Sequence, residues 1–177
     1  MSEQPGRYQR STGGLIGAML VLLVVVAVFV AFRSLVRDDV EVPVRTVDYA
    51  RTVEFARSQV EFPLLAPEEL PPGWRATSAD FVPDPGRWNL GLLTDEDRYV
   101  GLAQSRRSVE NMVETYVDPE AEQGSPVEIA GRRWQTWTDE AGDTALTRED
   151  AGVTVLVVSP AGLGVLTDFV ETLTTEG

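Results

Sequence analysis

Residues 153–173 read VTVLVVSPAGLGVLTDFVETL, and this stretch decides the fold. Its first six residues are almost wholly apolar, which predicts a central strand that is covered on both faces of a sheet. The remainder predicts a helix with Ser159 as its N-cap and Pro160 in its first turn. The apolar side chains of that helix share one face and are Leu163, Leu166, Val170 and Leu173, with Phe169 beside them.

Upstream of this stretch, runs of apolar and β-branched residues alternate with turn signals. The predicted elements are strands at residues 76–82, 88–93 and 99–105, a helix after Ser108, and strands at residues 127–129, 133–138 and 144–148. The acidic residues 118–126 are expected to form a loop. Strands followed by a helix, twice over, predict an α+β fold: a mostly antiparallel sheet with helices packed on one face.

A second feature of the chain is its apolar segment, LIGAMLVLLVVVAVFVAF, at residues 15–32. As a helix it spans about 27 Å, close to the roughly 30 Å hydrocarbon core of a bilayer. About a dozen Leu, Ile, Val and Phe residues favour insertion by about 4 to 8 kcal/mol. A cleaved signal peptide is the alternative, but its cleavage site needs small residues, whereas Phe29 stands two positions before Ala31. We expect an uncleaved transmembrane helix.

The orientation of this helix is not decided by its basic flanks, because two Arg residues precede it and two follow it. Residues 1–14 form a short tail without a domain to export, whereas long domains cross the membrane largely regardless of charge. We therefore expect a single-pass protein of the cell membrane with a cytoplasmic N-terminus and an extracytoplasmic C-terminal domain.

The predicted organisation has four parts. Residues 1–14 are the cytoplasmic tail and residues 15–32 the transmembrane helix. Residues 33–73 are expected to hold a juxtamembrane helix, with Asp48 as a plausible cap, and a linker rich in Pro. Residues 74–177 are expected to form the extracytoplasmic α+β domain.

The composition excludes several classes of mechanism. All basic residues are Arg, so the chain has no Lys, and it also has no His and no Cys. These absences exclude disulfides, thiolate nucleophiles, Ser-His-Asp triads, the usual zinc sites, Schiff bases and a P-loop lysine. The abundance of Arg, Ala, Gly, Pro and Val is typical of a high-GC genome, and adaptation to high salt is the alternative explanation for an acidic chain without Lys.

Charge restricts the partners. Residues 1–37 contain four Arg and one Glu, a formal charge of +3; the whole chain carries −13, which leaves −16 on the remainder. Such a field repels phosphate backbones and anionic head groups, so we expect no nucleic-acid partner.

Few residues are candidates for a site. Trp134 and Trp137 lie three apart on one predicted strand and therefore point to opposite faces, so one of them is a candidate platform for a ligand or partner. Core filling is the simpler interpretation. The acidic groups at 95–97 and at 139–143 lack the spacing of a calcium loop and are interpreted as solvated turns. We predict no catalytic residue, no metal site and no cofactor.

Several stretches together resemble a known family. They are LPPGW at residues 70–74, RWNLGLLT at 87–94, YVGLAQS at 99–105, ALTR at 145–148 and the closing stretch 153–173. The chain resembles domain of unknown function 4245, a family of uncharacterised actinobacterial membrane proteins. Its departures are an Asp-Glu-Asp turn at 95–97 and Pro160, where the family commonly has Gly. The resemblance implies an envelope location, but no activity and no functional residues.

Two functions follow as hypotheses. The first is a membrane-anchored, non-catalytic envelope protein whose outer domain binds a protein or a small ligand. The alternative is a carboxylate-dependent hydrolase acting on envelope glycans or lipids, which needs two acids facing each other across a cleft. Signalling across the membrane would need a partner helix, because residues 1–14 are too few to fold.

Overall fold

The computed structural model describes Met19, residues 22–26 and residues 46–175. The chain divides into two compact units, Met1–Pro43 and Val44–Gly177. Met19 and residues 22–26 are helical, whereas most of the predicted transmembrane segment, residues 15–32, lies outside the described residues. Within the described part of the chain, no helix is long and apolar enough to span a bilayer.

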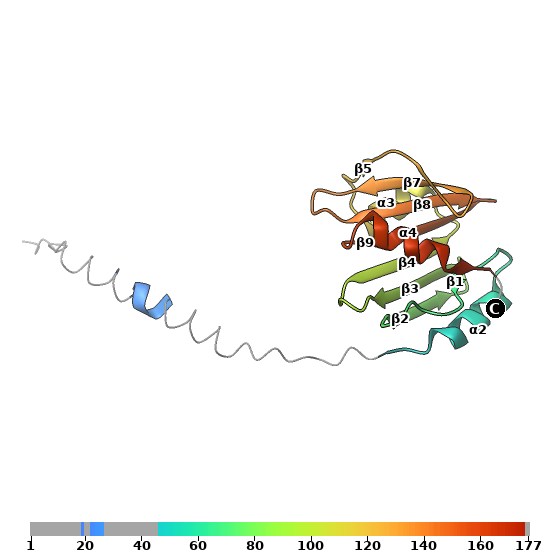
Figure 1. Cartoon of the computed structure of the whole chain (residues 1–177), viewed down its shortest axis with the longest axis horizontal. Helices are drawn as coiled ribbons and strands as arrows, with labels where there is room; N and C mark the ends of the chain where they lie inside the picture. The colour runs from blue at the N-terminus through green and yellow to red at the C-terminus, as the bar shows by residue number, and fades with distance from the viewer. Residues whose placement is uncertain (1–18, 20–21, 27–45, 176–177) are drawn as a thin grey trace, which may run out of the picture. The chain divides into compact units, whose positions relative to one another are not determined.

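The second unit contains runs of strands separated by short helices (Figure 1). In chain order they are α2 (Tyr49–Gln59), β1 (Ala66–Pro67), β2 (Arg75–Val82), β3 (Arg87–Leu93), β4 (Tyr99–Ser105), α3 (Val109–Tyr116), β5 (Glu122–Gln123), β6 (Val127–Ile129), β7 (Arg132–Thr138), β8 (Thr144–Asp150), β9 (Val153–Ser159), α4 (Leu163–Glu171) and β10 (Leu173–Thr174).

The main sheet is antiparallel and has β9 at its centre. Its strand order is β2-β3-β4-β9-β8-β7-β5, with β6 also paired to β7. Val157 of β9 lies opposite Leu102 of β4 on one side and Leu146 of β8 on the other. All seven residues of β9 are buried. The prediction of a central apolar strand covered on both faces is therefore confirmed, as is the α+β class.

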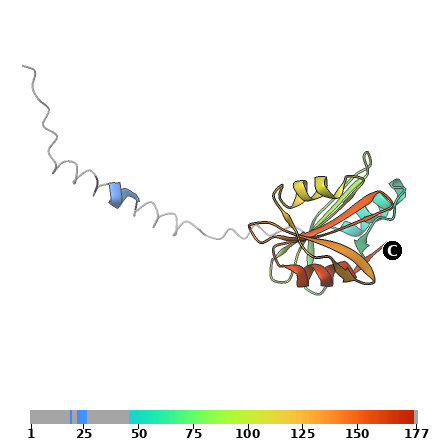
Figure 2. The ribbon, with the colours of Figure 1, turned by 90° about the horizontal axis from the view of Figure 1, so that it is seen from above.

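The two faces of β9 belong to two hydrophobic clusters. Val155 and Val157 join a large cluster with side chains of α2 and α4, whereas Leu156 and Val158 join a smaller one with α3. Helices α2 and α4 thus share one face, as expected, while α3 lies on the opposite face, as Figure 2 shows for α3 and α4. The reason is the apolar character of β9 itself, since each of its faces needs a cover.

Helix α3 begins as predicted, and α4 does not. The Oγ of Ser108 caps α3 by accepting the N–H of Asn111 at 3.3 Å. The N-cap of α4 is Gly162, not Ser159 as the sequence predicted. Ser159 instead ends β9, where its Oγ donates to the carbonyl of Tyr99 at 2.7 Å and accepts from the N–H of Ala161 at 3.0 Å. The helix starts only after Gly162, which has a φ of 87°.

Three short strands lie in segments predicted to be extended chain, loop or helix. β1 comes from the Pro-rich stretch and pairs with β10, whose Leu173 was expected on the last helix. β5 comes from the acidic segment and pairs with the end of β7. These pairings join segments far apart in the chain, so local sequence patterns do not reveal them.

The compact unit begins before residue 74, the expected boundary of the domain. Val53 and Ala56 of α2 and Leu64 of the Pro-rich stretch are buried in the large cluster. Residues 44–73 are therefore part of the domain rather than a linker outside it. Among the described residues, both hydrophobic clusters consist of residues of this unit. We therefore expect residues 44–177 to fold without the N-terminal segment.

The substitution Leu156→Ala tests whether α3 buries this face of β9. The side chain of Leu156 is 0% exposed, so Leu156→Ala in residues 44–177 is expected to lower the free energy of unfolding by about 2–5 kcal/mol through lost contacts and a cavity. Leu163→Ala is the matched control; its side chain is 38% exposed, and we expect a change within about 0.5 kcal/mol. Urea titrations followed by circular dichroism measure both values. Equal losses in the two variants would contradict the described core.

Candidate functional site

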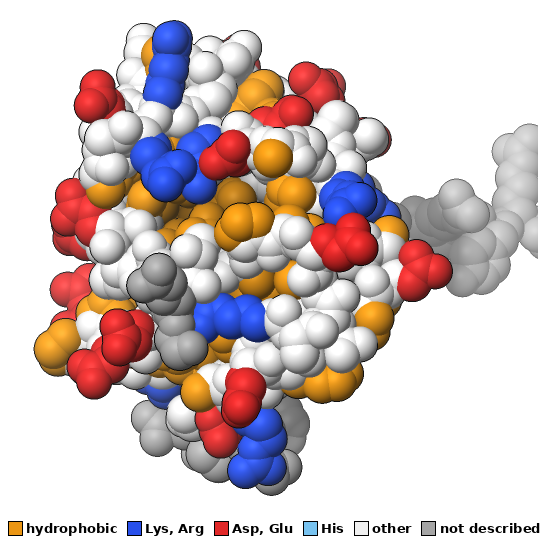
Figure 3. Space-filling model, turned by 90° about the vertical axis from the view of Figure 1, so that its right-hand side faces the viewer, with side chains coloured by type: hydrophobic (Ala, Val, Ile, Leu, Met, Phe, Trp, Pro, Cys, Tyr) orange, Lys and Arg blue, Asp and Glu red, His pale blue; other side chains and the backbone are white. Residues whose placement is uncertain are grey.

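A pocket of about 440 Å³ opens on the face of the sheet that α2 and α4 cover. Its walls come from β4, β7, β8 and β9, from the end of α4 and from the β1–β10 side of the domain. Figure 3 shows a hollow with hydrophobic atoms on its floor beside a group of basic side chains. The apolar lining comprises Leu65, Ile129, Val153, Val155, Val170 and Leu173.

One wall of the pocket is fixed by Gln104, a buried polar side chain on β4. Its Oε1 accepts the N–H of Leu65 at 2.9 Å, and its Nε2 donates to the carbonyl of Pro63 at 2.8 Å. The carbonyl of Leu65 in turn accepts the Nε1–H of Trp88 at 3.1 Å. These bonds satisfy the backbone of a segment without regular structure and hold it against the sheet.

In the lining of the pocket, a guanidinium lies over an aromatic ring. The Cζ of Arg148 is 4.9 Å from the ring centroid of Trp134, a cation–π contact between β8 and β7. Trp134 is 2% exposed. Among the described residues, neither the Nε of Arg148 nor the Nε1 of Trp134 has a hydrogen-bond partner, although both atoms are buried. Both donors are thus unpaired within the described chain, but they have almost no accessible surface, so an acceptor from outside reaches them only after a local rearrangement.

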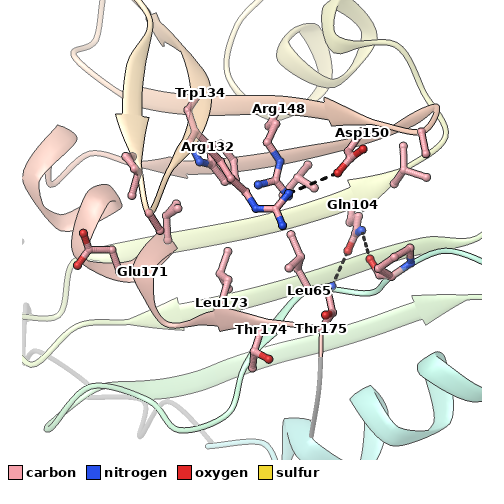
Figure 4. A pocket seen from close by; sticks show the side chains of 17 residues that line it. Leu65, Gln104, Arg132, Trp134, Arg148, Asp150, Glu171, Leu173, Thr174 and Thr175 are labelled. Carbon is pink, nitrogen blue, oxygen red and sulfur yellow. Dashed lines mark hydrogen bonds and ion pairs between the residues drawn. The ribbon is translucent and has the colours of Figure 1, made fainter.

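A second guanidinium stands next to the first. Arg132 forms an ion pair with Asp150 at 3.6 Å, and both of these side chains are largely exposed. Figure 4 shows Arg132 and Arg148 side by side, with Asp150 near Arg132. Burial lowers the pKa of Arg148, and the charge of Arg132 lowers it further, while Asp150 opposes the shift. Arg148 nevertheless stays protonated at neutral pH because arginine starts from a very high pKa.

The other side of the pocket differs in character. Leu173 and Thr175 contribute to it together with Glu171 from the last turn of α4. In Figure 4, Glu171 lies across the pocket from the arginine pair and from Asp150. The lining therefore has basic side chains at one end and apolar side chains in the middle. Its two acidic side chains, Asp150 and Glu171, lie on opposite sides of the pocket.

The two tryptophans singled out by the sequence lie on opposite faces of β7, as their spacing predicted. Trp134 lines the pocket, whereas Trp137 packs against the cluster under α3 and donates from Nε1 to the Oγ1 of Thr147 at 2.8 Å. Sequence reasoning missed Arg132 and Arg148, because single arginines on strands form no motif. Arg is one of the abundant residue types of this chain, so composition did not single them out either.

The acidic turns show no sign of a metal site. In the first, Asp97 forms an ion pair with Arg75. In the second, the Oδ1 of Asp139 accepts the N–H of Asp143 at 2.8 Å. Within the described ranges, no three acidic side chains are grouped as metal ligands would be. These contacts are those of ordinary turns.

Comparison with known families decides the relationship of the chain. Residues 7–173 match the family described as Protein of unknown function (DUF4245). The chain belongs to this family. The match includes both the apolar N-terminal segment and the pocket up to Leu173. No curated protein matches the chain, and no solved structure does.

We expect the hydrogen bonds of Gln104 to stabilise the wall of this DUF4245 pocket. Gln104→Ala leaves the N–H of buried Leu65 and the partly buried carbonyl of Pro63 without these partners, so we expect the free energy of unfolding to fall by about 1–3 kcal/mol. Gln135→Ala is the matched control, because that side chain bonds the carbonyl of Gly124 at the exposed surface. Its expected change is below about 1 kcal/mol. Chemical denaturation measures both, and a Gln104→Ala domain as stable as the control would show that the wall does not depend on this residue.

Proposed function

We propose that this chain is a membrane-anchored, non-catalytic envelope protein whose extracytoplasmic domain binds a small ligand in the pocket beside Trp134 and Arg148. The observation that carries the proposal is the combination of a preformed hollow of about 440 Å³ with the guanidinium of Arg148, which lies over Trp134 in its lining. Small-molecule sites usually measure roughly 300–1,000 Å³ and combine apolar walls with a few convergent polar groups. A small ligand suits this concave site better than a protein surface does.

The anchor rests on the apolar N-terminal segment. Residues 15–32 carry no charge, and their described part, Met19 and residues 22–26, is helical with every side chain at least 50% exposed. An apolar helix with its side chains exposed is a suitable surface for lipid tails, and its backbone groups are satisfied internally. The family match begins at residue 7 and so contains this segment.

The absence of catalysis is part of the proposal. The chain lacks His, Cys and Lys, so carboxylates would have to perform general acid and base chemistry. The pocket contains Asp150 and Glu171, which lie on different sides of it, and Asp150 is paired with Arg132. A carboxylate on each side of a pocket is what the alternative, a hydrolase, requires; the observation that counts against it is the ion pair of Asp150, which points to Arg132 rather than to Glu171.

The predicted topology can be tested with single cysteines, because the natural chain has none. Ser125→Cys places a thiol on the exposed surface of the domain, and Ser2→Cys places one in the N-terminal tail. We expect a membrane-impermeant maleimide to label Ser125→Cys in intact, wall-stripped cells and Ser2→Cys only after lysis. The reverse pattern would place the domain in the cytoplasm and remove the envelope role.

Ligand binding can be tested with anilinonaphthalene sulfonate, a fluorescent apolar anion. Residues 44–177 are expected to bind one molecule saturably while the near-ultraviolet circular dichroism of the folded domain is retained. Leu173→Trp should abolish this binding by filling the pocket, whereas Leu163→Trp, on the exposed surface of α4, should not. Unchanged binding in the Leu173→Trp variant would contradict the proposed site.

A further inference from the structure

The chemistry of the pocket narrows the class of ligand, given the proposed function. Six of its lining side chains are aliphatic, and they lie on β6, β9, α4, β10 and the segment before β1. A fully polar ligand would leave this lining without apolar contacts and would lose its own hydration there. A fully apolar ligand would cover Arg148 without giving its charge a counterion. A ligand with both an apolar body and an anionic group can contact the aliphatic lining and provide a counterion for Arg148 at the same time.

The number of positive charges without a partner in the pocket limits how many negative charges a ligand can carry. Arg132 already pairs with Asp150, whereas no ion pair of Arg148 is found among the described residues. The part of the chain after residue 37 carries a formal charge of −16, which repels ligands with several negative charges. One uncompensated guanidinium therefore matches a single anionic group and disfavours nucleotides.

The anion has a defined place in the pocket. Arg148 lines the pocket, so an anionic acceptor can pair with its guanidinium. The Nε of Arg148 and the Nε1 of Trp134 also lack partners among the described residues, but they are buried and can join such a contact only after a side chain shifts. Arg132 stands beside them, and its exposed pair with Asp150 is of the kind that contributes little stability. Arg132 can therefore turn from Asp150 toward a bound anion with little loss of stability.

We propose that the pocket binds a single-chain amphiphile, whose carboxylate or phosphate head pairs with Arg148 and whose chain lies along the aliphatic lining toward Leu173. The inference rests on the proposed ligand-binding function and adds the ligand class to it. Arg148 is the residue that distinguishes the anionic amphiphile from a neutral one of the same length.

Calorimetry on residues 44–177 tests this assignment with dodecanoate, dodecyl phosphate and 1-dodecanol, each below its aggregation limit. We expect one dodecanoate or dodecyl phosphate per domain, bound at least tenfold more tightly than dodecanol. The tighter of the two anions tells whether a free fatty acid or a phosphate head group is the better match. Equal binding of dodecanoate and dodecanol would overturn the inference.

Two variants test whether Arg148 is responsible for the tighter binding of dodecanoate. Arg148→Met keeps an unbranched, flexible stem, although a shorter one, and removes the charge, so dodecanoate affinity should fall at least tenfold while dodecanol affinity stays unchanged. Arg106→Met is the matched control, because Arg106 lies outside the pocket and is largely exposed. Equal urea midpoints of wild type and both variants verify that the fold is intact.

The outcomes separate the two proposals. If anilinonaphthalene sulfonate binds and Leu173→Trp blocks it, but dodecanoate does not bind, the small-ligand function stands and the ligand class is wrong. If neither compound binds the folded domain, the proposed function fails as well. Loss of dodecanoate binding in Arg106→Met to the same degree as in Arg148→Met would remove the assigned role of Arg148.

Discussion

The burial of β9 on both faces is the constraint on which the rest of the domain depends. Each of its seven side chains is withdrawn from water, so the neighbouring strands β4 and β8 must pair with both of its edges, and helices must cover both of its sides. α3 covers Leu156 and Val158, while α4 covers Val155 and Val157. The hairpins on either side of β9 then extend the sheet outward to β2 and to β5.

The pocket lies where α4, one of the helices that cover β9, ends. α4 ends at Glu171, and the chain turns into β10, which pairs with β1 rather than continuing over the main sheet. Val153 and Val155 of β9, which are buried core residues, therefore also line the hollow at the edge of the core. Arg148 lies opposite Val155 in the register of β8 and β9, which brings a charged side chain to this gap. An arginine there is partly desolvated, and its position over Trp134 is the feature on which the proposed ligand depends.

Local patterns were sufficient to predict the long strands, because alternation and turn signals are written in adjacent residues. They also predicted that Trp134 and Trp137 face opposite ways, but not which one lies at the pocket. That choice depends on the register of β7 against β8, and Arg148 meets Trp134 only through it. The pairing of β1 with β10 and the late start of α4 after Gly162 likewise depend on tertiary contacts and on one backbone conformation. The family supplied no functional residues to fill these gaps.

The most direct measurement is a ¹⁵N–¹H NMR titration of residues 44–177 with dodecanoate, observed at the indole groups of the four tryptophans. Trp134 Nε1 lies at the pocket without a partner among the described residues, whereas Trp137 Nε1 is bonded to Thr147 on the opposite face. The account predicts a saturable shift of the Trp134 indole signal while the Trp137 signal stays in place. A fixed Trp134 signal, or equal shifts of both, would contradict it.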